Sequence, residues 1–575
     1  MKRLGNIGIA GLVVLQILHG GNYRVTTPTA FSQRVPLLQP GDTITLAAGV
    51  WNNAQLNFAG SGTLLSPILM RAESQGGVVF SGSSYLRIGG NYLVVDGFVF
   101  ENGSSPSGAV IEFRTSGGTG STYCRLTNTK IKSYNPGDST LDYKWVSLYG
   151  SYNRVDHCWF EGKTHSGTTL VVWLSAQPNY HRIDHNYFGP RPNLGFNGGE
   201  TIRVGTSDWS MYDSYTTVEY NLFERCDGEI EIISNKSCEN VYRYNVFLDN
   251  KATLTLRHGN RCSVYGNFFF AHRLSSSGGI RIIGEDHKVF NNYIEGTTGD
   301  DFRSGISLVD GIPNSALNGY FQVKRAIVVF NTLVNNTKSI TVGAGKSATN
   351  TLPPLDCTIA NNVVVSSYSP LITLTDTPGN MTWEGNVLNG ATVGTTLPPS
   401  NQLVNPQLVL GTDSLWRPQQ GSPALKSAVG SYAFVTDDMD GQARVAPFDA
   451  GADELASGGI LRTPITRNEV GPVATPTTME SERVTEIPRS IMLNQNFPNP
   501  FNPETVISFQ LSAVSQVILG IYDVLGREVA VLLNERLDPG VHAATWNASQ
   551  APSGMYFSRL IANGSVQTKK MILAK

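Results

Sequence analysis

The chain has 575 residues, of which 15% are charged and 59 are glycine, and its formal net charge is −2. The charged fraction is below the roughly 25% that is usual for soluble domains, and the abundant glycine favours turn-rich β-structure over helical bundles. The near-neutral charge excludes a globally basic surface, so no nucleic-acid partner is expected, and affinity for a charged polymer requires a local groove.

The first 21 residues resemble a secretory signal peptide. Lys2 and Arg3 precede an apolar run over residues 7–18, which is the usual order of such a signal, although a short buried strand or helix is an alternative. No later segment has the ~18 uninterrupted apolar residues of a membrane helix. We therefore expect an exported protein without a transmembrane segment once the signal is removed.

The six cysteines are scattered and form no C-x-x-C pair. An exported chain of this length does not depend on a disulfide framework. We expect buried thiols rather than metal ligands, and one or two disulfides remain possible.

A short phrase built around asparagine recurs through the middle of the chain, as in HNYF, YNLF, YNVF and GNFF. Its asparagines are Asn186, Asn221, Asn245, Asn267, Asn292, Asn331, Asn362 and Asn386. The shortest gaps are 22–25 residues, and the longer gaps are interpreted as the same unit with an inserted loop. Such a period indicates a solenoid, and the regular leucine pattern of leucine-rich repeats is missing. The prediction is an all-β fold, a right-handed parallel β-helix over residues 22–455.

The segment GEIEIIS (228–234) carries two acids in a β-branched run. Because a strand sends alternate side chains to opposite faces, Glu229, Glu231 and Ile233 should share one face. Ile230 and Ile232 should then share the other face. Counting eight residues from Asn221 and from Asn245 places ATLTLRH (252–258) over this segment, with Thr253, Thr255 and Arg257 over Glu229, Glu231 and Ile233.

Neighbouring coils extend this alignment into a polar outer column and an apolar inner column. The predicted outer column contains Arg203, Glu231, Thr255 and Arg281, and the predicted inner column contains Ile202, Ile230, Leu254 and Ile280. Lys236, Arg257 and His258 add to the outer stripe. A solvated face of mixed charge is the alternative interpretation. The concentration of charge within four coils of a charge-poor chain favours a functional site.

Two glutamates and Asn197 would suit a hard cation such as Ca²⁺, which prefers oxygen ligands. Lysine and arginine are poor zinc ligands but good partners for an anionic sugar. A lysine crowded by a metal and other cations can lose its proton and act as a base. No Ser-His-Asp arrangement and no phosphate-binding glycine loop is apparent.

Four segments resemble a known family: NGGETIRVG, GEIEIISNKSCENVYRYNVF, TLTLRHGN and GGIRIIGEDHKVFNNYIEG. The resemblance is to polysaccharide lyase family 6, which contains alginate lyases and chondroitinase B, and it covers residues 22–455. Its most specific marks are an E-x-E followed five residues later by lysine, and an R-H-G whose arginine lies 21 residues after that lysine.

The resemblance implies Ca²⁺-assisted β-elimination on a uronic-acid polymer, giving 4,5-unsaturated ends. It implies metal ligands at Asn197, Glu229, Glu231 and, as a weaker candidate, Glu200. Lys236 would be the base that removes the C5 proton, and Arg257 would assist departure of the glycosidic oxygen as acid or charge stabiliser. Arginine is a poor proton donor at its ordinary pKa. His258, Arg203 and Arg281 would bind the substrate.

Alginate is the favoured substrate because NGGETIR looks more like the alginate-cleaving members; dermatan sulfate is the alternative. A non-catalytic carbohydrate-binding β-helix on the cell surface is another, and it would not need Lys236. A glycoside hydrolase is disfavoured, because the two glutamates lie beside a lysine rather than across a scissile bond. Preference for M- or G-blocks and for internal or terminal bonds stays open.

The C-terminal quarter changes character three times. Residues 437–454 contain a D-x-D-G fragment without the glutamate of an EF-hand, so they are interpreted as a closing coil without calcium. Residues 456–487, rich in Thr, Pro, Glu and Ser, are predicted to be a linker. Residues 488–575 predict a small β-sandwich and resemble the type A sorting domain of the type IX (Por) secretion system. That resemblance implies release or surface attachment, with the type IX machinery as a partner.

Overall fold

The structure is a computed structural model. It describes residues 20–575 apart from 116–117, 119, 456–457, 474–490, 494, 497–498, 512–513 and 538–539. The predicted signal peptide lies outside the described residues except for Gly20 and Gly21. The chain divides into two compact units, Met1–Ala474 and Thr475–Lys575.

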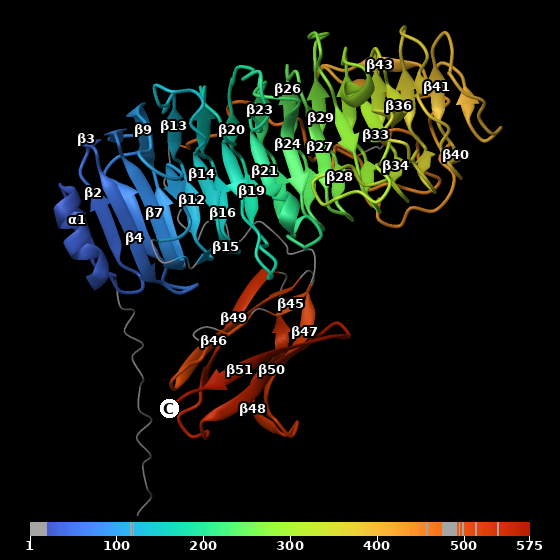
Figure 1. Cartoon of the computed structure of the whole chain (residues 1–575). Helices are drawn as coiled ribbons and strands as arrows, with labels where there is room; N and C mark the ends of the chain where they lie inside the picture. The colour runs from blue at the N-terminus through green and yellow to red at the C-terminus, as the bar shows by residue number, and fades with distance from the viewer. Residues whose placement is uncertain are drawn as a thin grey trace, which may run out of the picture. The chain divides into compact units, whose positions relative to one another are not determined.

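The first unit is a parallel β-helix, as predicted. Three sheets of 14 strands run along its length, and in each sheet a strand pairs with the strand one coil away (Figure 1). Sheet 1 runs from β1 (Asn22–Val25) to β40 (Thr382–Glu384), and sheet 3 from β3 (Gly49–Asn52) to β42 (Gln402–Leu403). Sheet 2 contains β18 (Leu170–Val172), β21 (Ile202–Gly205), β24 (Glu231–Lys236), β27 (Thr253–His258), β30 (Ile280–Ile282), β33 (Ile306–Val309), β36 (Ile340–Ala344) and β39 (Ile372–Leu374).

A short helix, α1 (Pro28–Arg34), packs on the first coils. Thr27 caps it by accepting the Ala30 N–H at 3.1 Å, and Phe31 is fully buried. A helix laid over the end of a solenoid shields core residues that have no further coil to pack against.

The repeated asparagines form a continuous ladder inside the β-helix, which confirms the repeat. The Asn221 N–H donates to Asn245 Oδ1 at 3.0 Å, and the Asn245 N–H donates to Asn267 Oδ1 at 3.0 Å. Each side-chain amide also donates to a carbonyl, as Asn221 Nδ2 does to Ile183 O at 2.8 Å. Because these polar groups are fully buried, the ladder supplies the partners that their burial requires.

The register predicted for sheet 2 is wrong by two residues. Glu231 pairs with Thr253 rather than Thr255, and the inner column contains Ile233 where Ile230 was expected. The turn before β24 spans residues 225–230, whereas the turn before β27 spans residues 249–252. Counting eight residues from each asparagine crosses these turns, so the longer turn after Asn221 shifts the predicted alignment by two residues.

Two β-bulges complete this difference. In the β24–β27 pair, Ile232 and Arg257 are extra residues without a partner in the register. A bulge reverses the alternation of faces, so Ile233 points inward although Glu231 does not. Consequently Arg203 is aligned with Ser234, Thr255 and Arg281, and not with Glu231.

After the last coil the chain folds back along the β-helix. It forms an antiparallel pair, β43 (Leu408–Leu410) with β44 (Trp416–Pro418), and then continues along the outside of the coils. Residues 458–473, assigned to the linker from sequence, belong to this segment: Ile465 and Val470 are buried, and the Gly471 N–H donates to His185 O at 2.9 Å. The described part of the predicted linker is therefore packed against the first unit.

The second unit is a β-sandwich of two antiparallel sheets, as predicted. One sheet contains β45 (Met492–Leu493), β46 (Glu504–Leu511) and β49 (Gly540–Asn547); the other contains β48 (Glu528–Leu537), β47 (Ser515–Asp523), β50 (Gly554–Ala562) and β51 (Ser565–Leu573). Phe509, Trp546 and Leu560 belong to the core between them.

All six cysteines are buried free thiols. Among the described residues, no helix combines the length and the apolar character needed to cross a membrane.

Candidate active site

Three glutamates meet where the adjacent strands β21 and β24 of sheet 2 begin. Glu200 precedes β21, Glu229 lies in the turn before β24, and Glu231 begins β24. One carboxylate oxygen of each lies within 4.8 Å of the others. Glu200, the weaker candidate from sequence, is therefore a full member of this cluster, which we call the glutamate trio.

The trio is buried and poorly supplied with hydrogen-bond donors. Glu200 Oε2 and Glu229 Oε1 are buried without a hydrogen-bond partner. Burial, followed by the charges of Glu200 and Glu231, raises the pKa of Glu229 to about 8. Carboxylates gathered in this way need a proton or a cation. A set made of oxygen atoms alone suits Ca²⁺, so the residues present fit that ion.

Asn197 is exposed and directly precedes Gly198, whose N–H donates to Glu229 Oε2 at 3.3 Å. The chain thus brings Asn197 to the edge of the trio. Its role as a ligand stays a prediction.

Lys236, at the end of β24, reaches the trio. Its Nζ is 3.8 Å from Glu200 Oε1, and its side chain is 17% exposed. The acids and the amine therefore lie on the same outer side of sheet 2, with the amine accessible from solvent.

Arg257 points to the same place because it is the extra residue of a bulge in β27. Its Nε is 3.9 Å from Glu231 Oε1. Its Nη1 donates to Gly319 O at 2.7 Å and its Nη2 donates to Asn318 O at 3.2 Å. Burial lowers the pKa of Arg257 from its ordinary value.

Tyr320 is a site residue that the sequence did not single out. The Arg257 guanidinium carbon is 4.1 Å from the centre of its ring, and Arg281 Nη2 donates to its hydroxyl at 2.9 Å. It belongs to the segment between β33 and β34 (Ile327–Val329). One signal marked that segment in advance, since the gap from Asn292 to Asn331 is the longest in the repeat.

Arg281, on β30, joins Tyr320 to the trio. Its Nη1 is 3.6 Å from Glu231 Oε1, and its guanidinium carbon is 4.0 Å from the centre of the Phe302 ring. Two arginines therefore flank Glu231, and aromatic faces hold both of them.

His258 and Arg203 occupy different surroundings. His258 is buried between Arg257 and Ser207, and burial lowers its pKa to about 3, so it is neutral at physiological pH. Arg203 lies over Trp173, with 5.5 Å between the guanidinium carbon and the ring centre. Among the described residues, no ion pair joins Arg203 to the trio.

Two buried basic side chains near the trio, Arg191 and Lys163, were not predicted from the sequence. Arg191 donates to Glu200 O at 2.9 Å and to Gly167 O at 2.8 Å. Lys163 donates to Ser166 O at 2.9 Å, and burial lowers its pKa well below the usual value. The Arg191 contacts tie the backbone of Glu200 to that of Gly167.

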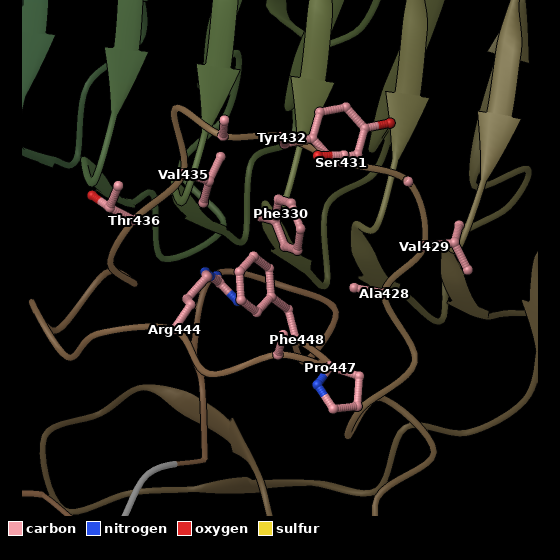
Figure 2. Close-up of a pocket in the computed structure, with 13 residues that line it drawn as sticks. Phe330, Ala428, Val429, Ser431, Tyr432, Val435, Thr436, Arg444, Pro447 and Phe448 are labelled. Atoms are coloured by element: carbon pink, nitrogen blue, oxygen red, sulfur yellow. The ribbon is translucent and has the colours of Figure 1, made fainter.

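A pocket of about 620 Å³ lies elsewhere, where residues 428–448 fold over the β-helix. Figure 2 shows Phe330, Arg444 and Phe448 together on its wall, and Tyr432 at its rim. None of the predicted site residues lines it. Arg444 is stacked on Phe330 and donates to Gly451 O at 2.7 Å, which is a packing role.

Residues 25–418 match the family model described as chondroitinase B, and residues 495–574 match the secretion system C-terminal sorting domain. A comparison with curated proteins found no match.

Solved structures of PL6 lyases are similar to the first unit. The PL6 family alginate lyase AlyGC is 36% identical with a TM-score of 0.71, over 80% of this chain and 59% of AlyGC. This chain thus spans 59% of the length of AlyGC. A mannuronic acid specific family 6 lyase from human gut microbiota is 32% identical, with a TM-score of 0.62, over 67% of this chain and 91% of its own. A PL6 polysaccharide lyase from Pseudopedobacter saltans is 27% identical, with a TM-score of 0.58, over 64% of this chain and 92% of its own.

The C-terminal sorting domain indicates type IX secretion to the cell surface or the extracellular space. The match over residues 25–418, together with the parallel β-helix that carries the glutamate trio, shows that the chain belongs to the chondroitinase B family.

Proposed function

We propose that the protein is a secreted polysaccharide lyase that cleaves alginate by Ca²⁺-assisted β-elimination. The observation that carries this proposal is the position of Lys236 Nζ, 3.8 Å from a trio of buried glutamates whose unpartnered oxygens fit a cation. A base beside a site for a charged carboxylate is what removal of an α-carbon proton requires.

Glu200, Glu229 and Glu231, with Asn197, would hold the Ca²⁺, which when bound neutralises the uronate carboxylate and so acidifies the C5 proton. Lys236, as the neutral amine, accepts that proton on Nζ. The C5–H electron pair becomes the C4–C5 double bond as the bond from C4 to the glycosidic oxygen breaks. The leaving oxygen keeps that bonding pair and takes a proton from solvent water as it departs.

Arg257 is better suited to stabilise the leaving oxygen than to protonate it. Its N–H groups are directed by Gly319 O and Asn318 O, so its positive charge is fixed before substrate binds. A charge held in advance stabilises the transition state without reorganisation. Arg281, His258 and Arg203 remain the proposed substrate-binding residues, with Arg281 nearest the trio.

The preference for alginate is supported by the similar structures, which include alginate lyases. The family model named for chondroitinase B supports dermatan sulfate as the second substrate to test.

The test is a panel of alginate, polyM, polyG and dermatan sulfate, followed by the ultraviolet absorbance of the unsaturated uronate. We expect absorbance to grow with alginate in Ca²⁺ and to fall after chelation. Full activity in metal-free buffer would remove the role of calcium. Binding of alginate without any absorbance change would instead identify a carbohydrate-binding protein.

A further inference from the structure

A second group of acids lies on sheet 2 beyond the glutamate trio. Asp310 directly follows β33, and Asp376 follows β39 with Thr375 between, so β36 separates the two strands. The Asp310 N–H donates to Ala344 O at 2.9 Å. Asp376 packs on Gly343 so closely that a Cβ there would be 2.6 Å from its backbone nitrogen. The missing side chain of Gly343 thus lets the two aspartates approach across the end of β36.

The carboxylate of Asp310 is buried without a hydrogen-bond donor. The residue is 0% exposed, and neither Oδ1 nor Oδ2 accepts a hydrogen bond. Burial, followed by the neighbouring Asp376, raises the pKa of Asp310 to about 7. A buried carboxylate with no donor is costly, so this group needs a proton or a positive charge that is not part of the chain.

The hydrogen bonds that the chain donates to this pair of aspartates go to Asp376 in the part of the chain that the structure describes. Lys346 Nζ and the Thr377 N–H both bind Asp376 Oδ1, at 2.6 and 2.7 Å. Asp301 is also close and accepts the Gly345 N–H at 2.7 Å. Lys346 is therefore bound to Asp376, and it donates no hydrogen bond to Asp310.

We propose that Asp310 and Asp376 bind a hard divalent cation, represented by Ca²⁺, at a site separate from the glutamate trio. The donors are carboxylate oxygens without sulfur or imidazole, which favours Ca²⁺ over zinc. A positive ion would also compensate the buried carboxylate of Asp310, to which Lys346 donates no hydrogen bond.

This site would fasten the segment that holds Arg257. Gly311 follows Asp310 and donates to Leu352 O at 2.7 Å, and the Ile312 N–H donates to Tyr320 O at 2.8 Å. The same segment then presents Gly319 O and the Tyr320 ring to Arg257. A cation at Asp310 therefore stabilises the base of an element that shapes the active site.

The experiment is calorimetric titration of the chelator-treated full chain with CaCl₂. We expect two binding events in the wild type, one in Asp310→Asn and one in Glu229→Gln. Asp356→Asn, which changes an exposed aspartate, should keep both events. Thermal unfolding of each variant without Ca²⁺ verifies that it is folded.

The outcomes separate this proposal from the proposed function. One event in the wild type that Asp310→Asn removes and Glu229→Gln keeps would support the Asp310 site and contradict calcium at the trio. The same number of events in Asp310→Asn as in the wild type would overturn the proposal. In that case a proton shared by the two aspartates accounts for the buried carboxylate of Asp310.

Discussion

Two clusters of three buried acids in this protein look alike in outline and differ in how their charge is balanced. The glutamate trio and the group of Asp438, Asp440 and Asp453 each bring three carboxylate oxygens within 4.8 Å. In the aspartate cluster, Arg417 binds Asp440 through two N–H groups and lies 3.0 Å from Asp453, while Asp438 accepts three backbone N–H groups. In the trio, the nearest cationic groups are 3.6–3.9 Å away and two buried oxygens have no partner.

The difference shows that proximity of acids does not by itself indicate a metal site. Arg417 supplies the positive charge among these aspartates. Its ion pairs connect parts of the segment that folds back along the β-helix. Around the trio, a lysine and two arginines stand 3.6–3.9 Å from the carboxylate oxygens. The trio, whose buried oxygens lack hydrogen-bond donors, is therefore the candidate for chemistry.

Replacing Lys236 beside the glutamate trio should have the largest effect on activity. Lys236→Ala removes the proposed base, and we expect turnover on alginate to fall by roughly 10²–10⁴-fold, the usual contribution of general base catalysis. The melting temperature should hardly change, because the side chain lies outside the core. Lys132→Ala, an exposed lysine on sheet 3, serves as the matched control. Substantial activity in Lys236→Ala would rule out its role as the base.

Replacing Arg417 in the aspartate cluster should lower stability instead. Arg417→Ala leaves buried aspartates without their cation, and breaking such a pair costs about 3–5 kcal/mol in the free energy of unfolding. Denaturant unfolding of the first unit measures the loss. If the charge of Arg417 is what distinguishes the aspartate cluster from the trio, Ca²⁺ should restore part of the stability in this variant. An unchanged unfolding midpoint would show that Arg417 is dispensable.

The two clusters should also respond to pH in the same direction when metal is absent. Burial first, and then neighbouring acids, raise the pKa of Glu229 to about 8 from 4.5, and burial raises the pKa of Asp453 to about 7. Between the ordinary pKa and the raised pKa of each group, the native state binds more protons than the unfolded state. The free energy of unfolding therefore falls as pH rises through that window.

Melting curves in EDTA across this range, for the wild type and for Glu229→Gln, isolate the contribution of the trio. We expect a shallower fall in the variant. With Ca²⁺ the sign should reverse for the wild type, because the ion needs the deprotonated carboxylates and its stabilisation grows with pH. Identical curves for the two proteins would contradict the assignment to Glu229.

The smallest effect should come from the hydroxyl of Tyr320. Tyr320→Phe keeps the ring beneath Arg257 but removes the acceptor for Arg281, and we expect kcat/KM to fall by about tenfold, equivalent to ~1.4 kcal/mol. Tyr320→Ala should cost more, because the stacking is lost as well. Tyr368→Phe is the control, since Tyr368 also lies 4.1 Å from an arginine, Arg273, away from the trio. Equal losses in both phenylalanine variants would argue against a specific role for Tyr320.

The recurrence of asparagine was enough to predict the β-helix, because each coil satisfies its buried polar groups in the same way. The glutamates of the trio, Lys236 and Arg257 could also be predicted, since they are charged residues in an apolar repeat. The pairing of Glu231 was not predicted, because the turn before it is two residues longer than the turn in the next coil, and the bulge at Ile232 then shifts the residues that follow. Tyr320, Arg191 and Lys163 come from segments without periodicity, so their contacts follow no repeat.

The sequence by itself therefore determined the solenoid, the ladder along its interior, the C-terminal sandwich and the residue types of the site. Tertiary structure alone decided which acids meet, that Glu200 joins them, that Arg417 fills one cluster, and that Tyr320 supports both arginines. The physical reason is the range of the interactions. Hydrogen bonds and apolar packing that repeat from coil to coil leave a period in the sequence, whereas charge balance at a site depends on single side chains delivered by turns of unequal length.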